Sequence, residues 1–157
     1  MKSKLYKNTR NLQIPRNKFN AKKITVDGVE FASISEARRY GELKLRLLAG
    51  EISCLELQKT YELIPAAYEE VPTGEVYRRG EHRGEQKLRR ICVEKAVNYV
   101  ADFVYRERSD SGELKTVVED VKGFRDPSSA AYKVFVIKRK LMLYKYGAKI
   151  REVYYDD

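Results

Sequence analysis

The sequence has a single histidine, two cysteines and no apolar run long enough to cross a membrane. A membrane-spanning helix needs about 20 apolar residues, and a secretory signal needs an apolar N-terminal segment that we do not find. Two cysteines do not make a disulfide framework, and neither Cys54 nor Cys92 has a nearby cysteine or histidine with which to bind zinc. We expect both to be buried thiols in a reducing cytoplasm.

Acidic residues are missing from the first 26 positions, which contain eight Lys or Arg residues. The remaining 131 residues hold 24 basic and 23 acidic side chains, so the net charge of +9 comes almost entirely from the N-terminal segment. A basic segment of this kind neutralises phosphates, and its binding weakens with salt. We predict a basic, flexible arm over 1–20 and one domain over 21–157, with a merely solubilising tail as the alternative to a nucleic-acid-binding arm.

Capping residues and glycines predict two helices. Ser33 followed by Glu36 is typical of a helix start, and Gly50 predicts the end of that helix. The second helix is expected over 126–147, with Asp126 as its cap.

Runs of β-branched and aromatic residues predict strands. These spans are 22–31 (a hairpin turning at Asp27-Gly28), 51–65, 88–107, 114–123 and 148–155. Residues 68–87 are polar and predict a loop or an exposed hairpin. The order is α-β-β-β-α-β after the arm and the small hairpin, so we expect an α/β fold with a mixed central sheet flanked by helices.

The sequence VVEDVKG places two charged side chains at the end of a strand. Alternation puts Asp120 and Lys122 on one face and Glu119 on the other. If the preceding hairpin is centred on Ser111, Asp102 stands across from Asp120. Facing carboxylates destabilise a sheet, so a divalent cation held by their oxygens is the expected compensation.

Alternation also predicts the faces of the preceding strand, and a third acid comes from the first helix. Val100, Asp102 and Val104 would share one face, and Tyr99, Ala101, Phe103 and Tyr105 the other. Glu36 projects from the apolar stripe of its helix, which is unusual for a carboxylate. A capping box with the Ser33 backbone is the alternative, and the two roles can coexist.

These residues have the composition of a site for metal-dependent phosphodiester hydrolysis. Glu36, Asp102, Asp120 and the carbonyl of Val121 would hold one or two Mg²⁺ (or Mn²⁺) ions, which activate water and polarise the phosphate. Lys122 would orient that water or stabilise charge on the phosphorane. A surface ion pair is the alternative for a lone D-x-K.

Several other polar residues are secondary candidates. Gln58 would bond a phosphate or a metal-bound water, unless it is an ordinary surface glutamine. Lys138 falls on the apolar stripe of the second helix, where it reaches the scissile phosphate or snorkels to solvent. The expected DNA-binding residues are Lys18, Lys22, Lys23, Lys133, Arg139 and Lys140.

The chain resembles the PD-(D/E)xK nuclease superfamily, with its restriction-endonuclease-like fold, and within it a phage- and prophage-encoded branch formerly described as a domain of unknown function. The resemblance covers roughly residues 18–155 and rests on NAKKITVDGVEFASISEARRYGELKLRLLAGEI, LELQ, YVADFVY, VVEDVKG and YKVFVIKRKLM. It implies an endonuclease whose active site is Glu36, Asp102, Asp120 and Lys122. The proline of the motif name is Ala101 here, and proline supplies no ligand.

The expected function is therefore a Mg²⁺-dependent DNA endonuclease that cuts branched replication or recombination DNA, in the bacterial host cytoplasm if a phage encodes it. A homodimer is compatible with this activity, because nicks on opposite strands need two sites. His82 lies in a glycine-bearing loop and argues against a histidine-based nuclease, and no nucleophile-elbow, phosphate-loop or zinc pattern is present. The alternative is a non-catalytic nucleic-acid-binding accessory protein that uses its basic arm and whose acids are structural.

Overall fold

A computed structural model describes residues 23–122 and 126–155. The elements in chain order are β1 (Ile24–Val26), β2 (Val29–Phe31), α1 (Ile34–Leu48), β3 (Ile52–Ile64), β4 (Ala67–Val76), β5 (Gln86–Glu94), β6 (Val97–Arg108), β7 (Leu114–Lys122), α2 (Ala130–Tyr146) and β8 (Ile150–Tyr154). The predicted arm over 1–20, with Lys18, and the neighbouring Lys22 lie outside the described residues. Neither described helix has the length and apolar character needed to span a bilayer.

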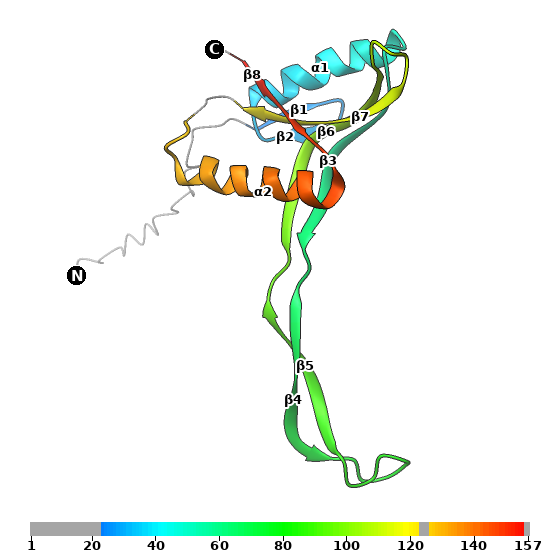
Figure 1. Cartoon of the computed structure of the whole chain (residues 1–157), viewed down its shortest axis with the longest axis vertical. Coiled ribbons are helices and arrows are strands. Elements are labelled where there is room, and N and C mark those ends of the chain that lie inside the picture. Colours follow the sequence, from blue (N-terminus) through cyan, green and yellow to red (C-terminus); the bar gives the residue numbers. More distant parts are fainter. Residues whose placement is uncertain (1–22, 123–125, 156–157) are drawn as a thin grey trace, which may run out of the picture.

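A four-stranded mixed sheet forms the centre of the body, with strand order β3-β6-β7-β8 (Figure 1). The pairs β3–β6 and β6–β7 are antiparallel, whereas β8 runs parallel to β7. The core divides into two clusters, which we call the α1-side and α2-side clusters after the helix that packs against each. These observations confirm a mixed α/β fold with a mixed central sheet and two helices.

The helix ends follow their capping residues, with one correction. Ser33 Oγ accepts a hydrogen bond from the Glu36 N–H at 3.1 Å, so the predicted start of α1 is confirmed. The predicted cap of α2 is wrong, because Ser129 and not Asp126 caps it. The Asp126 side chain accepts from the N–H and hydroxyl of Ser128. It therefore forms a local turn before the helix, and the helix begins later.

The alternation of faces in β3 and β6 is interrupted. The predicted common face of Tyr99, Ala101, Phe103 and Tyr105 is wrong. The first two belong to the α2-side cluster and the last two to the α1-side cluster, so the faces exchange at Asp102. Gln58, which the β3–β6 register places across from Asp102, has a φ of 50°, in the left-handed region. A left-handed residue in a strand turns the residues that follow toward the other face, which accounts for the exchange in β3.

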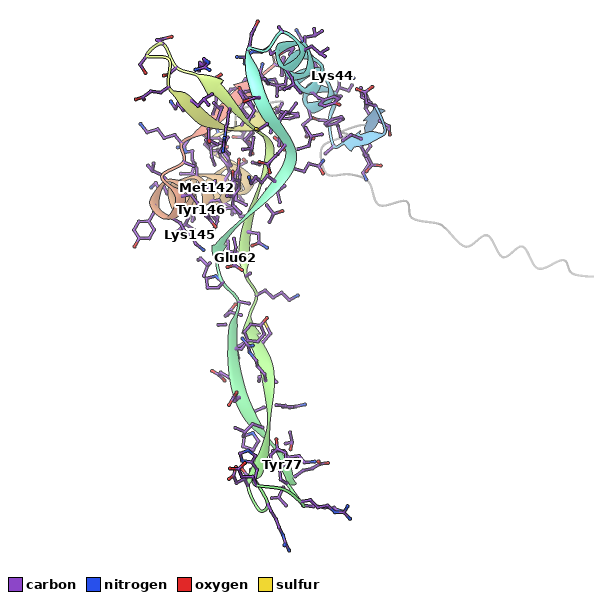
Figure 2. The ribbon with its side chains drawn as sticks, turned by 90° about the vertical axis from the view of Figure 1, so that its right-hand side faces the viewer. Lys44, Glu62, Tyr77, Met142, Lys145 and Tyr146 are labelled. Atoms are coloured by element: carbon purple, nitrogen blue, oxygen red, sulfur yellow. The ribbon has the colours of Figure 1, made fainter. Side chains whose placement is uncertain are left out.

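The predicted strand over 88–107 is two strands, β5 and β6. The chain leaves the central sheet after Ile64, runs out along β4, and returns along β5 to re-enter the sheet at Val97. Strands β4 and β5 form a separate ribbon that projects far from the body, as both views show (Figures 1 and 2). The exposed-hairpin alternative for residues 68–87 is thereby confirmed.

Both cysteines are exposed, so the prediction that they are buried is wrong. Cys54 has a φ of 53° and lies at an irregularity in the β3–β6 register, where one residue of β3 has no partner. Cys92 lies in β5, within the projecting ribbon, most of whose side chains are exposed.

Candidate functional site

The β6–β7 hairpin brings Asp102 and Asp120 to neighbouring positions. Its ladder runs from Arg108↔Leu114 to Phe103↔Glu119, which confirms the predicted hairpin centre at Ser111. Asp102 and Asp120 are the next residues beyond the last pair of this ladder. The ladder therefore ends where the two carboxylates begin.

Asp102 closes the end of the ladder with its side chain. Its Oδ2 accepts a hydrogen bond from the backbone N–H of Val121 at 2.6 Å. A strand N–H that faces its neighbour normally finds a backbone carbonyl, and here a carboxylate takes that role. The Asp102 carboxylate is therefore held between the two strands.

Asp120 is almost completely buried, with 6% of its surface exposed. Its Oδ1 accepts a hydrogen bond from the Tyr99 hydroxyl at 3.3 Å. Its Oδ2 forms an ion pair with the Lys122 ammonium, which also lies 4.0 Å from the centre of the Phe135 ring. The ammonium supplies charge but not a well-directed bond, because Oδ2 has no hydrogen-bond partner in the described part of the chain.

The two aspartates carry more negative charge than their surroundings neutralise. Burial raises the pKa of Asp102 from an ordinary 3.8 to about 7, and the charges of Asp120 and Glu36 raise it further against the opposing Val121 N–H and Lys122. Burial also raises the pKa of Asp120, partly opposed by the hydrogen bond and charge of Lys122. Tyr99, buried beside both carboxylates, has a raised pKa as well. The strand ends thus form a negatively charged, poorly solvated centre.

Glu36 lies near this centre but its oxygens have other partners. Oε2 accepts from the Ala32 N–H at 3.1 Å and Oε1 from the Ser33 hydroxyl at 3.0 Å, so the capping box is formed. Among residues 23–122 and 126–155, no three His, Cys, Asp or Glu side chains are placed to hold one ion. Glu36 therefore interacts with Asp102 through its charge, and its role as a metal ligand stays a prediction.

The donor set of Asp102 and Asp120 fits a divalent cation of the magnesium type. Mg²⁺ is usually bound by one or two carboxylates, with waters and substrate phosphates completing its shell. Asp120 Oδ2 is a buried carboxylate oxygen without a hydrogen bond. The carbonyl and N–H of a strand residue point to the same edge, so the carbonyl of Val121 faces the Asp102 side and can add a further oxygen.

The secondary candidates are distributed around this centre. Gln58 lies across from Asp102 in the register, but its exposed side chain donates to the Glu30 carbonyl at 3.3 Å. Lys138 is half-buried and makes no hydrogen bond or ion pair with a described residue. The remaining placements are Lys133 and Lys140 exposed, Arg139 paired with Glu152, and Lys23 paired with Glu30.

Glu119 has a structural role that the sequence did not predict. It is completely buried and accepts two hydrogen bonds from Arg39, at 2.9 and 2.8 Å, and one from Tyr105, at 2.6 Å. Arg151, its partner in the β7–β8 register, lies 3.4 Å away. The charge of Glu119 thus ties α1 to the sheet on the face opposite Asp120. An arginine three residues after Glu36 was the available signal.

Two open concavities lie elsewhere on the surface. One of about 370 Å³ is lined by α2 and β8 residues, and one of about 500 Å³ by residues of β7, β8 and the loop before β8. Neither is lined by Asp102 or Asp120. We base the candidate site on the carboxylate geometry, because a phosphodiester backbone binds open, charged surfaces and needs no enclosed cavity.

Comparison with known proteins gives one match. The family model described as "Protein of unknown function (DUF1064)" matches residues 16–155. None of the curated proteins and none of the solved structures gives a significant match.

Proposed function

The chain belongs to the DUF1064 family of proteins of unknown function, and we propose that it is a metal-dependent DNA endonuclease. One observation carries the proposal: Asp102 and Asp120 are held side by side at a strand end with incompletely neutralised charge and Lys122 next to them. Natural proteins retain such a destabilising cluster where it has a task, and hydrolysis of a phosphodiester is the task that these groups suit.

The element order around the sheet supports a restriction-endonuclease-like core. Apart from the projecting ribbon and the β1–β2 hairpin, the chain runs α1, β3, β6, β7, α2, β8. The proposed catalytic residues lie where that fold places its acids. Asp102 is on β6, Asp120 and Lys122 are on β7, and Glu36 is in the first turn of α1.

Each residue has a defined part in the proposed reaction. Asp102 and Asp120 would hold Mg²⁺ or Mn²⁺, with the Val121 carbonyl and Glu36 as additional oxygens. A bound Mg²⁺ supplies a Lewis acid and an activated water. Lys122 is within reach of any phosphate bound at Asp120, where its ammonium would stabilise charge on the phosphoryl oxygens or orient the attacking water.

DNA is the proposed substrate because of the charge around the site. Lys138 is a half-buried cation on the α2 face that also carries Phe135, and it is a candidate for the scissile phosphate. Lys133 and Lys140 on α2 would contact flanking phosphates, and the basic residues before β1 would add salt-sensitive affinity. Branched replication or recombination DNA in the host cytoplasm remains the proposed target.

The proposal is tested by incubating the full chain with supercoiled plasmid and a four-way DNA junction, with Mg²⁺, Mn²⁺ or chelator. We expect divalent-dependent cleavage that Asp120→Asn abolishes. Asp110→Asn, in the exposed turn between β6 and β7, is the matched control and should cleave normally. Binding without cleavage in wild type would favour the accessory-protein alternative, in which the Asp120–Lys122 pair is structural.

A further inference from the structure

The β4–β5 ribbon buries little of its own surface. Seven of its apolar side chains are exposed or only half-buried, namely Tyr68, Val71, Val76, Tyr77, Leu88, Ile91 and Val93. An isolated two-stranded ribbon is marginally stable in water, because it has no second layer on which to pack. A long ribbon of this kind is therefore expected to be covered when the protein is at work.

The charge of the ribbon changes sign along its length. The half nearest the body, residues 67–71 and 90–94, holds three glutamates and a single arginine. The outer half, residues 72–89, holds five Lys or Arg residues and three glutamates. The ribbon as a whole is neutral, with a net negative base and a net positive tip.

The charges that define this polarity have no partners within the described chain. Glu69 and Glu70 at the base, and Arg78, Arg79 and Arg83 at the tip, form no ion pair with another described residue. Local pairs do exist elsewhere on the ribbon. Arg90 lies over the Tyr68 ring at 3.8 Å, and Lys87 pairs with Glu75. The unpaired charges are those at the two ends.

We propose that the ribbon is an association arm that binds the ribbon of a second copy of the chain. A two-fold axis makes the contact self-complementary, so that the tip of each ribbon lies on the base of the other. This arrangement places Arg78 and Arg79 of one copy near Glu69 and Glu70 of its partner. It also covers the exposed apolar side chains along the ribbon.

The dimensions of the ribbon suit this arrangement. The ten residues of β4 extend about 33 Å, so two ribbons lying side by side bring each tip to the other base. Pro72 has no N–H and makes β4 a poor edge for strand addition. Side chains rather than ladder hydrogen bonds at β4 therefore make the contact. A nucleic acid fits less well, because the ribbon has as many acidic as basic residues.

Charge reversal tests the proposal in the full chain by sedimentation equilibrium at low salt. Wild type should be a dimer. Both Arg78→Glu/Arg79→Glu (the tip variant) and Glu69→Arg/Glu70→Arg (the base variant) should weaken self-association by about tenfold or more, because each brings like charges together twice per dimer. An equimolar mixture of the two variants should associate again, because both tip-to-base contacts then join opposite charges.

The mixture distinguishes the proposal from its rivals. The altered side chains are exposed, and far-ultraviolet circular dichroism identifies any variant that fails to fold. A monomeric wild type, or a tip variant that dimerises as wild type does, would overturn the proposal. So would a mixture that remains monomeric. Loss of DNA binding in the tip variant of a monomeric protein would assign the ribbon to nucleic acid instead.

Discussion

Asp102 Oδ2 accepts the backbone N–H of Val121 at 2.6 Å, so a side chain of β6 completes the hydrogen bonding of β7. This bond sets the orientation of the Asp102 carboxylate through the backbone, before any ligand arrives. It also holds that carboxylate next to Asp120, in spite of the repulsion that raises the pKa of both groups. The site is thus preorganised at some expense to stability.

The first prediction concerns that loss of stability. The pKa of Asp102 rises from 3.8 to about 7 on folding, so between these pH values the folded protein keeps a proton that the unfolded chain has lost. The free energy of unfolding therefore falls as pH rises from about 4 to about 7. Asp102→Asn removes this term and keeps an acceptor for Val121. We expect the variant to exceed wild type by about 1–3 kcal/mol at pH 8 in urea unfolding without divalent ions.

Two comparisons make this result specific to Asp102. The difference between variant and wild type should disappear near pH 4, where both states of Asp102 are protonated. Asp110→Asn should follow the wild-type curve at every pH. Parallel pH profiles for wild type and Asp102→Asn would contradict the proposed charge of this site.

A second prediction separates Lys122 from the metal ligands. Lys122→Gln should reduce cleavage by about a hundredfold or more, because the transition state loses a positioned cation. Its affinity for Mn²⁺ should be retained or increased, because the ammonium no longer occupies Asp120 Oδ2. Cleavage and Mn²⁺ titration on one preparation measure both effects. Parallel loss of Mn²⁺ binding and cleavage would show that Lys122 only supports the fold of the site.

A third prediction distinguishes Glu119 from its neighbour. Glu119→Gln should lower the free energy of unfolding by about 3 kcal/mol or more, because Arg39 loses its buried counter-charge. The stabilisation that Mn²⁺ gives should persist, because Glu119 faces away from the proposed ligands. Urea unfolding with and without Mn²⁺ measures both quantities. If the Mn²⁺ effect vanished, Glu119 rather than Asp120 would be the acid of the motif.

A fourth prediction separates the two roles of Glu36. Gln at this position can still close the capping box with Ser33, whereas Ala cannot. Glu36→Gln should unfold within about 0.5 kcal/mol of wild type and yet cleave poorly, and Glu36→Ala should lose stability as well. Wild-type cleavage by the Gln variant would leave Glu36 as a helix cap alone.

Local patterns predicted much of this structure. The Ser33–Glu36 spacing located the start of α1, and the residues around Ser111 gave the correct β6–β7 register. They failed where distant parts of the chain decide the outcome. The exchange of faces at Asp102 depends on the left-handed Gln58 of another strand, which alternation within β6 does not reveal.

The network around Glu119 was unpredictable for a similar reason. Its partners Arg39 and Arg151 come from α1 and β8, and only the folded sheet brings them together. Alternation correctly separated Glu119 from Asp120, but it gave no reason for a buried charge on that face. The ribbon was also divided wrongly, because β5 and β6 are joined by two residues without a strong turn signal.

The central claim is that Asp102 and Asp120 share a divalent cation, and thermal unfolding in increasing Mn²⁺ tests it most directly. A ion that binds only the folded state raises the midpoint temperature with concentration. We expect this rise in wild type and in Asp110→Asn, and its loss in both Asp102→Asn and Asp120→Asn. An equal rise in all four proteins would contradict the account.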